Sequence, residues 1–535
     1  MNFTIVDYIV FGIYCLLILG VGLFVSRDKS KQRNAKDYFL AGKSLPWWAI
    51  GASIIAANIS AEQFIGMSGS GYVLGLAIAS YEWMGGFTLL IVGKYFLPVF
   101  IREELYTIPE FIEKRFSTQL KTILAVFWIS LFIFINLSSV LYLGALALQT
   151  ILGLKMIYGI IGLALFAAAY SLYGGLSAVA WTDVIQVVFL VMGGLLTMYL
   201  ALDALGAGEG VIHGLSSLID ATPERFHMIL DKTNPEYFNL PGIWVLIGGL
   251  WVANLYYFGF NQYIIQRTLA AKSLKEAQKG VLLAGFLKLL IPFVVVIPGI
   301  ACFVIVNDPE LLSQFGTNNL PSLQQADKAY PWLLQFLPAG LKGIAVAALA
   351  AAIVSSLASM LNSTATIFTM DIYLPYFSKT KDRNDRILVK VGRITAVVAL
   401  IIGCMMAPLL DTLDQAYQFI QEYTGIVSPG ILAVFLMGLF WKKTTNKAAI
   451  WGVLLSIPVA LGLKTLPDFP WMHQMGLTAL ITLLVIFLIS HLEGKGQDNQ
   501  KGLQISKDLF NTEPLFNILA FMISLFIVVL YILFW

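Results

Sequence analysis

The stretch Asn58-Ile59-Ser60-Ala61-Glu62-Gln63 interrupts an apolar run, 46–72, that is long enough to cross a bilayer. Glycines follow this stretch at Gly66, Gly69 and Gly71. A continuous helix would tolerate one of these features but hardly all of them. Irregular backbone at membrane depth occurs only where it is buried in protein or lines a water-filled cavity. The stretch therefore predicts a broken transmembrane helix beside a polar cavity.

A second interruption of the same kind reads Ala253-Asn254-Leu255-Tyr256-Tyr257-Phe258-Gly259-Phe260-Asn261-Gln262. If 45–205 and 241–440 are two five-helix repeats, each interrupted helix opens its repeat. Such a correspondence indicates a substrate site near the bilayer midplane of a transporter built from inverted repeats. The alternative is a pair of kinked helices without a site.

The composition predicts an all-α integral membrane protein. Of its 535 residues, 58% are hydrophobic and 12% are charged, against roughly 45–50% and about 25% in soluble domains. Alternating β-barrel patterning is absent from the sequence. We expect about fourteen spans of the roughly 20 residues that a bilayer requires. They are 5–26, 46–72, 75–101, 119–152, 156–173, 181–205, 241–266, 279–306, 340–373, 388–409, 413–440, 447–465, 471–491 and 514–535.

Three segments flank the two repeats. They are an additional N-terminal helix with an inner loop (1–44), an outer loop (206–240) and three C-terminal transmembrane helices (441–535). Lys and Arg gather in the loops of one side, which the positive-inside rule assigns to the cytoplasm. Both termini are then outside, in a multi-pass protein of the cell inner membrane.

Several function classes are disfavoured. A net charge of +3 does not suggest nucleic acid binding, and there is no phosphate-binding loop. The histidines lie in an outer loop or near span ends, away from the polar midplane groups, so we do not expect an enzyme. An oligomer is compatible with the sequence.

Ionisable and amide side chains inside spans are costly in lipid and indicate function. Glu82, Lys288 and Gln421 lie within predicted spans, as do the amides of the two interruptions. Glu82 and Lys288 could form a structural ion pair or offer an acceptor and a donor to a polyol. Amides, one acid, one base and tyrosines suit a neutral, hydroxyl-rich ligand such as a sugar.

The span 340–373 is rich in small residues. Ala352, Ser355 and Ser356 share one helical face. Hydroxyls and free carbonyls form a neutral oxygen cage suited to a singly charged cation, and the absence of Asp from this run argues against Ca²⁺ or Mg²⁺. Helix packing through small residues is the alternative.

Five stretches carry a resemblance to a known family. They are Asp37-Tyr-Phe-Leu-Ala-Gly-Lys-Ser-Leu-Pro-Trp-Trp, Ala57-Asn-Ile-Ser-Ala-Glu-Gln-Phe-Ile-Gly-Met, Tyr173-Gly-Gly-Leu-Ser-Ala-Val-Ala-Trp-Thr-Asp-Val-Ile-Gln, Trp251-Val-Ala-Asn-Leu-Tyr-Tyr and Ile420-Gln-Glu-Tyr-Thr-Gly. With the serine run of 340–373, they make the chain resemble the solute:sodium symporter family from the loop at Asp37 to the final span.

The resemblance implies a core of ten helices in two inverted repeats, with one helix before and three after. It implies a sugar site at Gln63, Glu82, Asn254, Lys288 and Gln421. Tyr257 would be the inner gate, and the outer gate would be Met67, Tyr81 and Tyr417. Na⁺ would be bound by the backbone carbonyls of Ala56, Ile59 and Ala352 and the hydroxyls of Ser355 and Ser356.

Asp183 would lie on the sodium exit path, with the alternative of a helix N-cap after the Gly174-Gly175 turn. The chain departs from a sugar-transporting member at Gly85, Phe258 and Tyr417, where that member has Ser, Trp and Phe. Loss of one hydroxyl contact is worth roughly 0.5–1.5 kcal/mol. It bears on the preferred sugar rather than on the class of transport.

The predicted function is Na⁺-coupled symport of a galactose- or glucose-like hexose by alternating access, with Na⁺ as coupling ion and no organic cofactor. The first alternative is a Na⁺ symporter for another small solute, such as sialic acid, an amino acid or a vitamin. A passive channel is the second, and it would require a ring of like residues around an axis, which the sequence does not contain.

Overall fold

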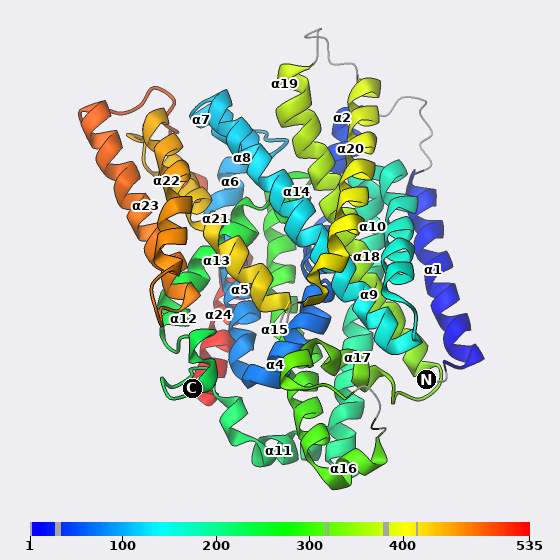
Figure 1. Ribbon diagram of the computed structural model, residues 1–535. Helices are drawn as coiled ribbons and strands as arrows, with labels where there is room; N and C mark the ends of the chain where they lie inside the picture. The colour runs from blue at the N-terminus through cyan, green and yellow to red at the C-terminus, as the bar shows by residue number, and fades with distance from the viewer. Residues whose placement is uncertain (1–2, 27–33, 316, 318–319, 378–384, 413–415) are drawn as a thin grey trace.

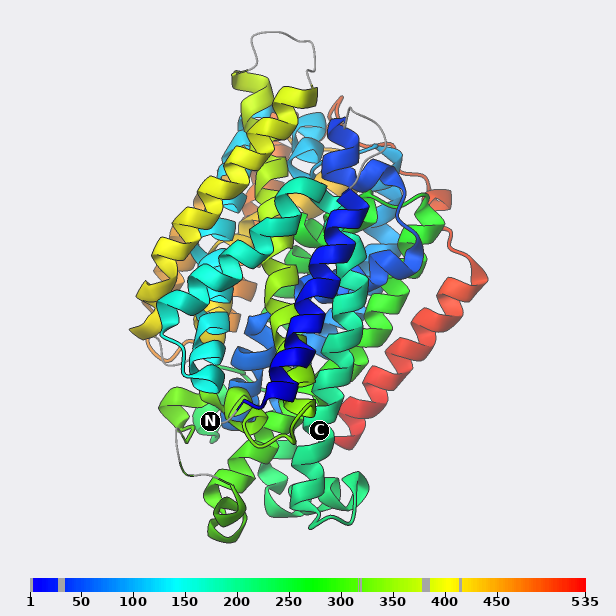
Figure 2. The ribbon, with the colours of Figure 1, turned by 90° about the vertical axis from the view of Figure 1, so that its right-hand side faces the viewer.

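The computed structural model describes residues 3–26, 34–315, 317, 320–377, 385–412 and 416–535, and the side chains among them except at 170, 173 and 412–419. Within these residues all regular elements are helical, apart from one isolated bridge between Leu45 and Ala271. Figures 1 and 2 show long helices standing side by side as a bundle. Eleven of the described helices are long and apolar enough to cross a membrane.

We call ten helices around the two breaks the central helices. They are α3 (Trp47–Asn58), α4 (Ser68–Leu74), α5 (Ser80–Ile91), α9 (Ser138–Leu152), α10 (Met156–Leu205), α13 (Gly249–Phe260), α14 (Gln262–Leu269), α15 (Leu274–Asn307), α18 (Leu341–Ile367) and α21 (Ala416–Phe440).

The remaining helices lie around this centre or at its ends (Figure 1). Peripheral long helices are α1 (Ile5–Ser26), α8 (Thr118–Ser130), α20 (Asp385–Met406), α22 (Asn446–Lys464), α23 (Trp471–Gly494) and α24 (Pro514–Leu533). Shorter ones are α2 (Ala35–Leu40), α6 (Leu97–Arg102), α7 (Ile108–Arg115), α11 (Val211–Ala221), α12 (Trp244–Ile247), α16 (Pro309–Gln314), α17 (Ala329–Leu334) and α19 (Leu374–Tyr376).

Both predicted interruptions occur. Helix α3 ends at Asn58, Ile59 is extended (φ −82°, ψ 93°), and the chain resumes as a π-helix over Glu62–Met67. Helix α13 ends at Phe260, and Asn261 is extended (φ −81°, ψ 120°) before α14 begins. Each break therefore leaves helix ends inside the bundle, where side chains must satisfy the freed backbone groups.

The three predicted spans beyond these eleven are the interrupted windows 46–72 and 241–266 and the window 156–173. The last is helical, but its apolar part, Met156–Ala169, is too short to count among the eleven. It ends before a turn within α10 at Gly175 (φ 57°, ψ −152°). A Cβ at this glycine would collide with the carbonyl oxygen of Tyr38, so no other residue fits there.

Helix α18 is the most enclosed of the eleven spans and α1 the least. Its apolar window is 94% buried, against 17% for that of α1. The first turn of α18 is nevertheless capped from α1, because the Asp7 carboxylate accepts hydrogen bonds from the backbone N–H groups of Gly340 (2.8 Å) and Gly343 (2.9 Å). Asp7 thereby satisfies donors that a helix start leaves unpaired.

The start of α1 and the end of α24 lie at the same end of the bundle, opposite α19 (Figures 1 and 2). Near the C-terminus, the Phe534 carbonyl accepts a hydrogen bond from the Met228 backbone N–H (2.6 Å), which places α24 against the loop after α11.

Candidate functional site

A polar cavity lies between the first helix break and helix α13, which leads into the second break. It leaves about 50 Å³ for the centres of water-sized molecules. Helices α5, α13, α15, α21 and α23 and the break after α3 supply its walls. The lining residues are Asn58, Glu62, Gln63, Tyr81, Glu82, Ala253, Asn254, Tyr256, Tyr257, Phe258, Lys288, Gln421, Thr424, Gly425, Ser428 and Met475. The structure thus brings together all five residues of the predicted sugar site.

Glu82 and Lys288 form a buried ion pair in the cavity wall. The Lys288 Nζ donates to the Glu82 Oε2 at 2.5 Å, and their side chains are 1% and 3% exposed. The same ammonium lies 5.1 Å from the centre of the Phe258 ring, a cation–π contact. The ion pair expected as one option is therefore present. Because Glu82 and Lys288 also line the cavity, they are placed where they could contact a polyol, the other option.

Three buried polar atoms of the lining residues have no hydrogen-bond partner among the described residues. They are the Asn58 Oδ1, the Glu62 Oε1 and the Asn254 Nδ2. Leaving such an atom unsatisfied costs about 1–3 kcal/mol. Two acceptors and one donor in one cavity are complementary to a ligand that both donates and accepts hydrogen bonds, as a hydroxyl does.

The predicted inner gate, Tyr257, belongs to a chain of hydrogen bonds. Its hydroxyl accepts from the Asn58 Nδ2 (3.1 Å) and from the Tyr263 hydroxyl (2.7 Å). The chain joins the last residue of α3 to α13 and α14, so it connects the two breaks. Opening the cavity at Tyr257 would have to exchange these bonds.

The residues of the predicted outer gate are placed differently. Tyr81 lines the cavity, whereas Met67 is fully buried and is not among the lining residues. Tyr417 lies on α21, but its side chain is outside the described residues.

A second polar cluster surrounds Asp183 on α10. The Asp183 carboxylate accepts hydrogen bonds from the hydroxyls of Ser53 on α3 and Ser355 on α18, each at 2.5 Å. An Arg267 guanidinium nitrogen lies 3.8 Å from Asp183, and both side chains are fully buried. Four helices, α3, α10, α14 and α18, thus meet at one carboxylate. The alternative role of Asp183 as an N-cap is wrong, because α10 continues past Gly175 and the residue lies within it.

The predicted sodium ligands lie next to this cluster. The Ser356 hydroxyl donates to the Ala57 carbonyl at 3.0 Å, which joins α18 to the end of α3. Ala56, Ile59, Ala352 and Ser355 are fully buried. Two of the predicted ligands, Ser355 and Ser356, therefore already connect α18 to Asp183 and to the first break.

Comparison with known proteins identifies the family to which this helical bundle belongs. The sodium:solute symporter family matches residues 38–456. The chain belongs to this family. As a family member it is a multi-pass, Na⁺-coupled transporter and not an enzyme, and the resemblance noted in its sequence is confirmed.

Relatives of this symporter span nearly its full length. A sodium/glucose cotransporter of Vibrio parahaemolyticus is 65% identical over 99% of this chain and 98% of its own. The human sodium/myo-inositol cotransporter 2 is 35% identical over 85% of this chain and 69% of its own. Among solved structures, a substrate-bound outward-open Na⁺-coupled sialic acid symporter has a TM-score of 0.79 at 24% identity, covering 92% of this chain and 98% of its own. At that identity the likeness concerns the fold.

Sequence reasoning missed Arg267 in this symporter. Its place in the sequence, shortly before the basic loop with Lys272, suggests a cytoplasmic charge, but it is fully buried in α14 and donates hydrogen bonds to the Ser53 hydroxyl (3.1 Å), the Tyr263 carbonyl and the Ser359 hydroxyl. The break at Asn261 was the available signal, because it starts a new helix that carries Arg267 back among the central spans.

Gly85 and Phe258, two of the positions expected to differ from a sugar-transporting member, are in contact. A Cβ on Gly85 would lie 2.9 Å from the Phe258 Cε2 and 3.7 Å from the Asn254 Oδ1. The Phe258 ring therefore lies against the space that a side chain at position 85 would need. The two departures are best understood as one change in the cavity wall.

Proposed function

We propose that this symporter couples the inward movement of Na⁺ to the uptake of a neutral hexose of the galactose or glucose type. The observation that carries the proposal is the cavity wall: a self-neutralised Glu82–Lys288 pair beside the free acceptors Asn58 Oδ1 and Glu62 Oε1 and the free donor Asn254 Nδ2. A pyranose presents several hydroxyls, each of which can donate and accept.

The charges of the cavity argue against an anionic solute. Lys288 is the single cationic side chain among the described lining residues, and Glu82 already pairs with it. Glu62 adds a further acid to the wall. A carboxylate such as that of sialic acid or an amino acid would meet acids without an available cation. The sodium/glucose cotransporter that is 65% identical supports the same choice of substrate.

For the remaining residues we propose the roles that the family resemblance implies. Gln63, Glu82, Asn254, Lys288 and Gln421 bind the sugar, and Tyr257 closes the site on the inner side. Met67, Tyr81 and Tyr417 close it on the outer side. Na⁺ is held by the carbonyls of Ala56, Ile59 and Ala352 with Ser355 and Ser356, and it leaves past Asp183, whose carboxylate is hydrogen-bonded to Ser355.

The proposed architecture is that of two inverted five-helix repeats, 45–205 and 241–440, each opening with a broken helix. Segment 1–44 precedes them, the outer loop 206–240 separates them, and the three helices of 441–535 follow. Both termini face outward from the cell inner membrane, because the basic loops are assigned to the cytoplasm. Alternating access then exposes the site between the breaks to either side in turn.

The available driving force suffices for accumulation. One Na⁺ moving through about 100 mV gains roughly 2.3 kcal/mol. A tenfold Na⁺ gradient adds about 1.4 kcal/mol. Tight coupling to one ion could thus support an accumulation of several hundred-fold.

The test is uptake of labelled galactose into proteoliposomes with and without an inward Na⁺ gradient, with K⁺ as the control ion. Unlabelled galactose, glucose, myo-inositol, sialic acid and proline are the competitors. We expect uptake only with Na⁺, and competition by the hexoses but not by the two carboxylates. Uptake that ignores the gradient would indicate a passive pore, and inhibition by sialic acid or proline but by no hexose would refute the proposed substrate.

A further inference from the structure

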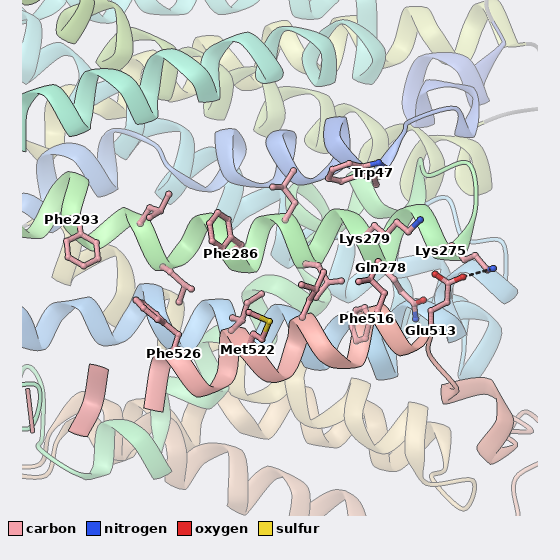
Figure 3. A pocket seen from close by; sticks show the side chains of 17 residues that line it. Trp47, Lys275, Gln278, Lys279, Phe286, Phe293, Glu513, Phe516, Met522 and Phe526 are labelled. Carbon is pink, nitrogen blue, oxygen red and sulfur yellow. Dashed lines mark ion pairs between the residues drawn. The ribbon is translucent and has the colours of Figure 1, made fainter. Parts of the chain in front are cut away.

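A second hollow lies on the membrane-facing side of the bundle, between α15 and α24. It leaves about 640 Å³ for the centres of water-sized molecules. Phe286 and Phe293 of α15 and Leu519 and Phe526 of α24 are among the side chains that form its walls (Figure 3). Figure 2 shows α24 as the outermost helix on its side of the bundle. This groove opens toward the hydrocarbon of the bilayer rather than toward the transport path.

One end of the groove is polar: two lysines and one acid line it, and Glu276, which accepts the Trp47 backbone N–H at 2.8 Å, lies beside them. Trp47, Lys275, Lys279 and Glu513 lie together there, and Phe293 and Phe526 lie at the other end (Figure 3). The Lys275 Nζ is 2.6 Å from the Glu513 Oε1, so these two charges cancel. Lys279 has no ion-pair partner among the described residues. One cation of the rim is therefore available to a ligand.

The position of this rim is that of a membrane–water interface. Lys275 and Lys279 begin α15 directly after the loop that holds Lys272. Trp47 begins α3 and is 40% exposed, as interfacial tryptophans often are. Basic pockets between transmembrane helices on the cytoplasmic side are suited to anionic lipid head groups. The apolar length and the polar end with Lys279 together match the two parts of a phospholipid.

We propose that the α15–α24 groove binds an anionic phospholipid, with one acyl chain between the two helices and its phosphate at Lys279 and Lys275. Its ligand is part of the bilayer and is not transported, so the proposal does not rest on the proposed function. The bound chain would support α15 from outside. Leu289 faces the groove, while the preceding residue, Lys288, faces the polar cavity.

The experiment is native mass spectrometry of the full chain in detergent, with phosphatidylglycerol and phosphatidylcholine added in equal amounts. We expect phosphatidylglycerol to be retained several-fold better. Lys279→Gln should lower its retention to that of phosphatidylcholine. Leu519→Trp, which fills the groove, should lower the retention of both lipids by several-fold.

Each variant has a matched control. Lys443→Gln removes a half-buried lysine outside the groove, and Leu525→Trp enlarges an exposed residue of α24 that does not line it. Both should retain lipid as the unmodified protein does. Gel filtration excludes misfolded variants, and Lys279→Gln decides the test if Leu519→Trp fails to fold.

Three outcomes would overturn the proposal. One is equal retention of the two lipids by the unmodified protein. Another is the same loss in a variant and its control. The third is a dimer that Leu519→Trp dissociates, since this would assign the groove to a second copy of the chain.

Discussion

The polar cavity and the Asp183 cluster are both buried and both join helices from distant parts of the chain, yet their hydrogen bonding differs. In the cavity, the Asn58 Oδ1, Glu62 Oε1 and Asn254 Nδ2 lack partners among the described residues. In the cluster, both carboxylate oxygens of Asp183 are bonded, to Ser53 and to Ser355. The cavity therefore has polar atoms left for hydrogen bonds to a ligand, whereas the carboxylate of the cluster is already hydrogen-bonded within the protein.

This difference predicts which substitutions change ligand affinity and which change the stability of the fold. Unsatisfied atoms in the cavity cost stability until a ligand pairs with them, so changes there should act mainly on substrate affinity. The Asp183–Arg267 pair has no exposure to water, so removal of one partner leaves a buried charge. Changes there should act on the fold first and on Na⁺ coupling through Ser355.

The largest expected effect is that of Asp183→Leu. It leaves the Arg267 guanidinium buried without its carboxylate and should destabilise the protein by about 3–5 kcal/mol. Thermal unfolding of the purified protein in detergent measures this. Adding Arg267→Leu removes the stranded charge and should restore most of the stability. A single variant as stable as the double one would show that the pair does not stabilise this cluster.

Lys288→Ala tests the cavity in the same way. It leaves Glu82 and Glu62 in the cavity wall without a cation. A loss of about 3 kcal/mol in the free energy of sugar binding corresponds to a decrease of more than 100-fold in sugar uptake. Na⁺-dependent uptake in proteoliposomes is the measurement. Lys342→Ala removes another buried lysine, on α18 and outside the cavity, and serves as control. Equal losses in the two variants would contradict a role in binding.

Ser356→Ala should have a smaller effect, directed at Na⁺. It removes one hydroxyl from the proposed ion site and should weaken apparent Na⁺ affinity roughly tenfold, equivalent to about 1–1.5 kcal/mol. Uptake at saturating Na⁺ should be largely kept. Ser363→Ala, two turns further along α18 and bonded to Gln266 instead (2.8 Å), should leave the Na⁺ dependence unchanged. A shift of the same size in both would remove Ser356 from the site.

Gly85→Ala should have the smallest effect. Its Cβ would press on the Phe258 ring, and mild overpacking of about 1 kcal/mol would weaken sugar affinity roughly fivefold. Adding Phe258→Leu should recover part of the loss, because the ring no longer occupies that space. Competition of labelled galactose by unlabelled sugar measures both variants. Additive losses would show that the two positions act independently.

The sequence predicted the parts of this fold that local chemistry determines. Polar residues and glycines inside apolar runs located both breaks, and costly side chains at membrane depth located Glu82 and Lys288. It could not decide whether those two residues pair, because that depends on how α5 meets α15. The two breaks explain why the windows 46–72 and 241–266 are not among the eleven long spans, and the turn at Gly175 explains the absence of 156–173.

Residues that depend on distant contacts escaped prediction. Arg267 stands beside a basic loop in sequence, and its charge is paired in the buried interior with Asp183, which lies far away in the sequence on α10. Met475 belongs to α23, a helix expected outside the core, yet it lines the cavity. The break at Asn261 is the one sequence signal near Arg267, and Met475 carries no local signal that separates it from its neighbours.

The cap that Asp7 places on α18 has a consequence for biosynthesis. Its partner Gly343 lies 336 residues further along the chain. At about 5–20 residues per second, a ribosome needs on the order of 20–70 seconds to reach it. During that interval α1 is already made, and its carboxylate can accept a hydrogen bond from the local backbone N–H of Thr4 but not from those of α18. Helix α1 can pack against α10 before then, but α18 receives its cap from Asp7 only after Gly343 has been made.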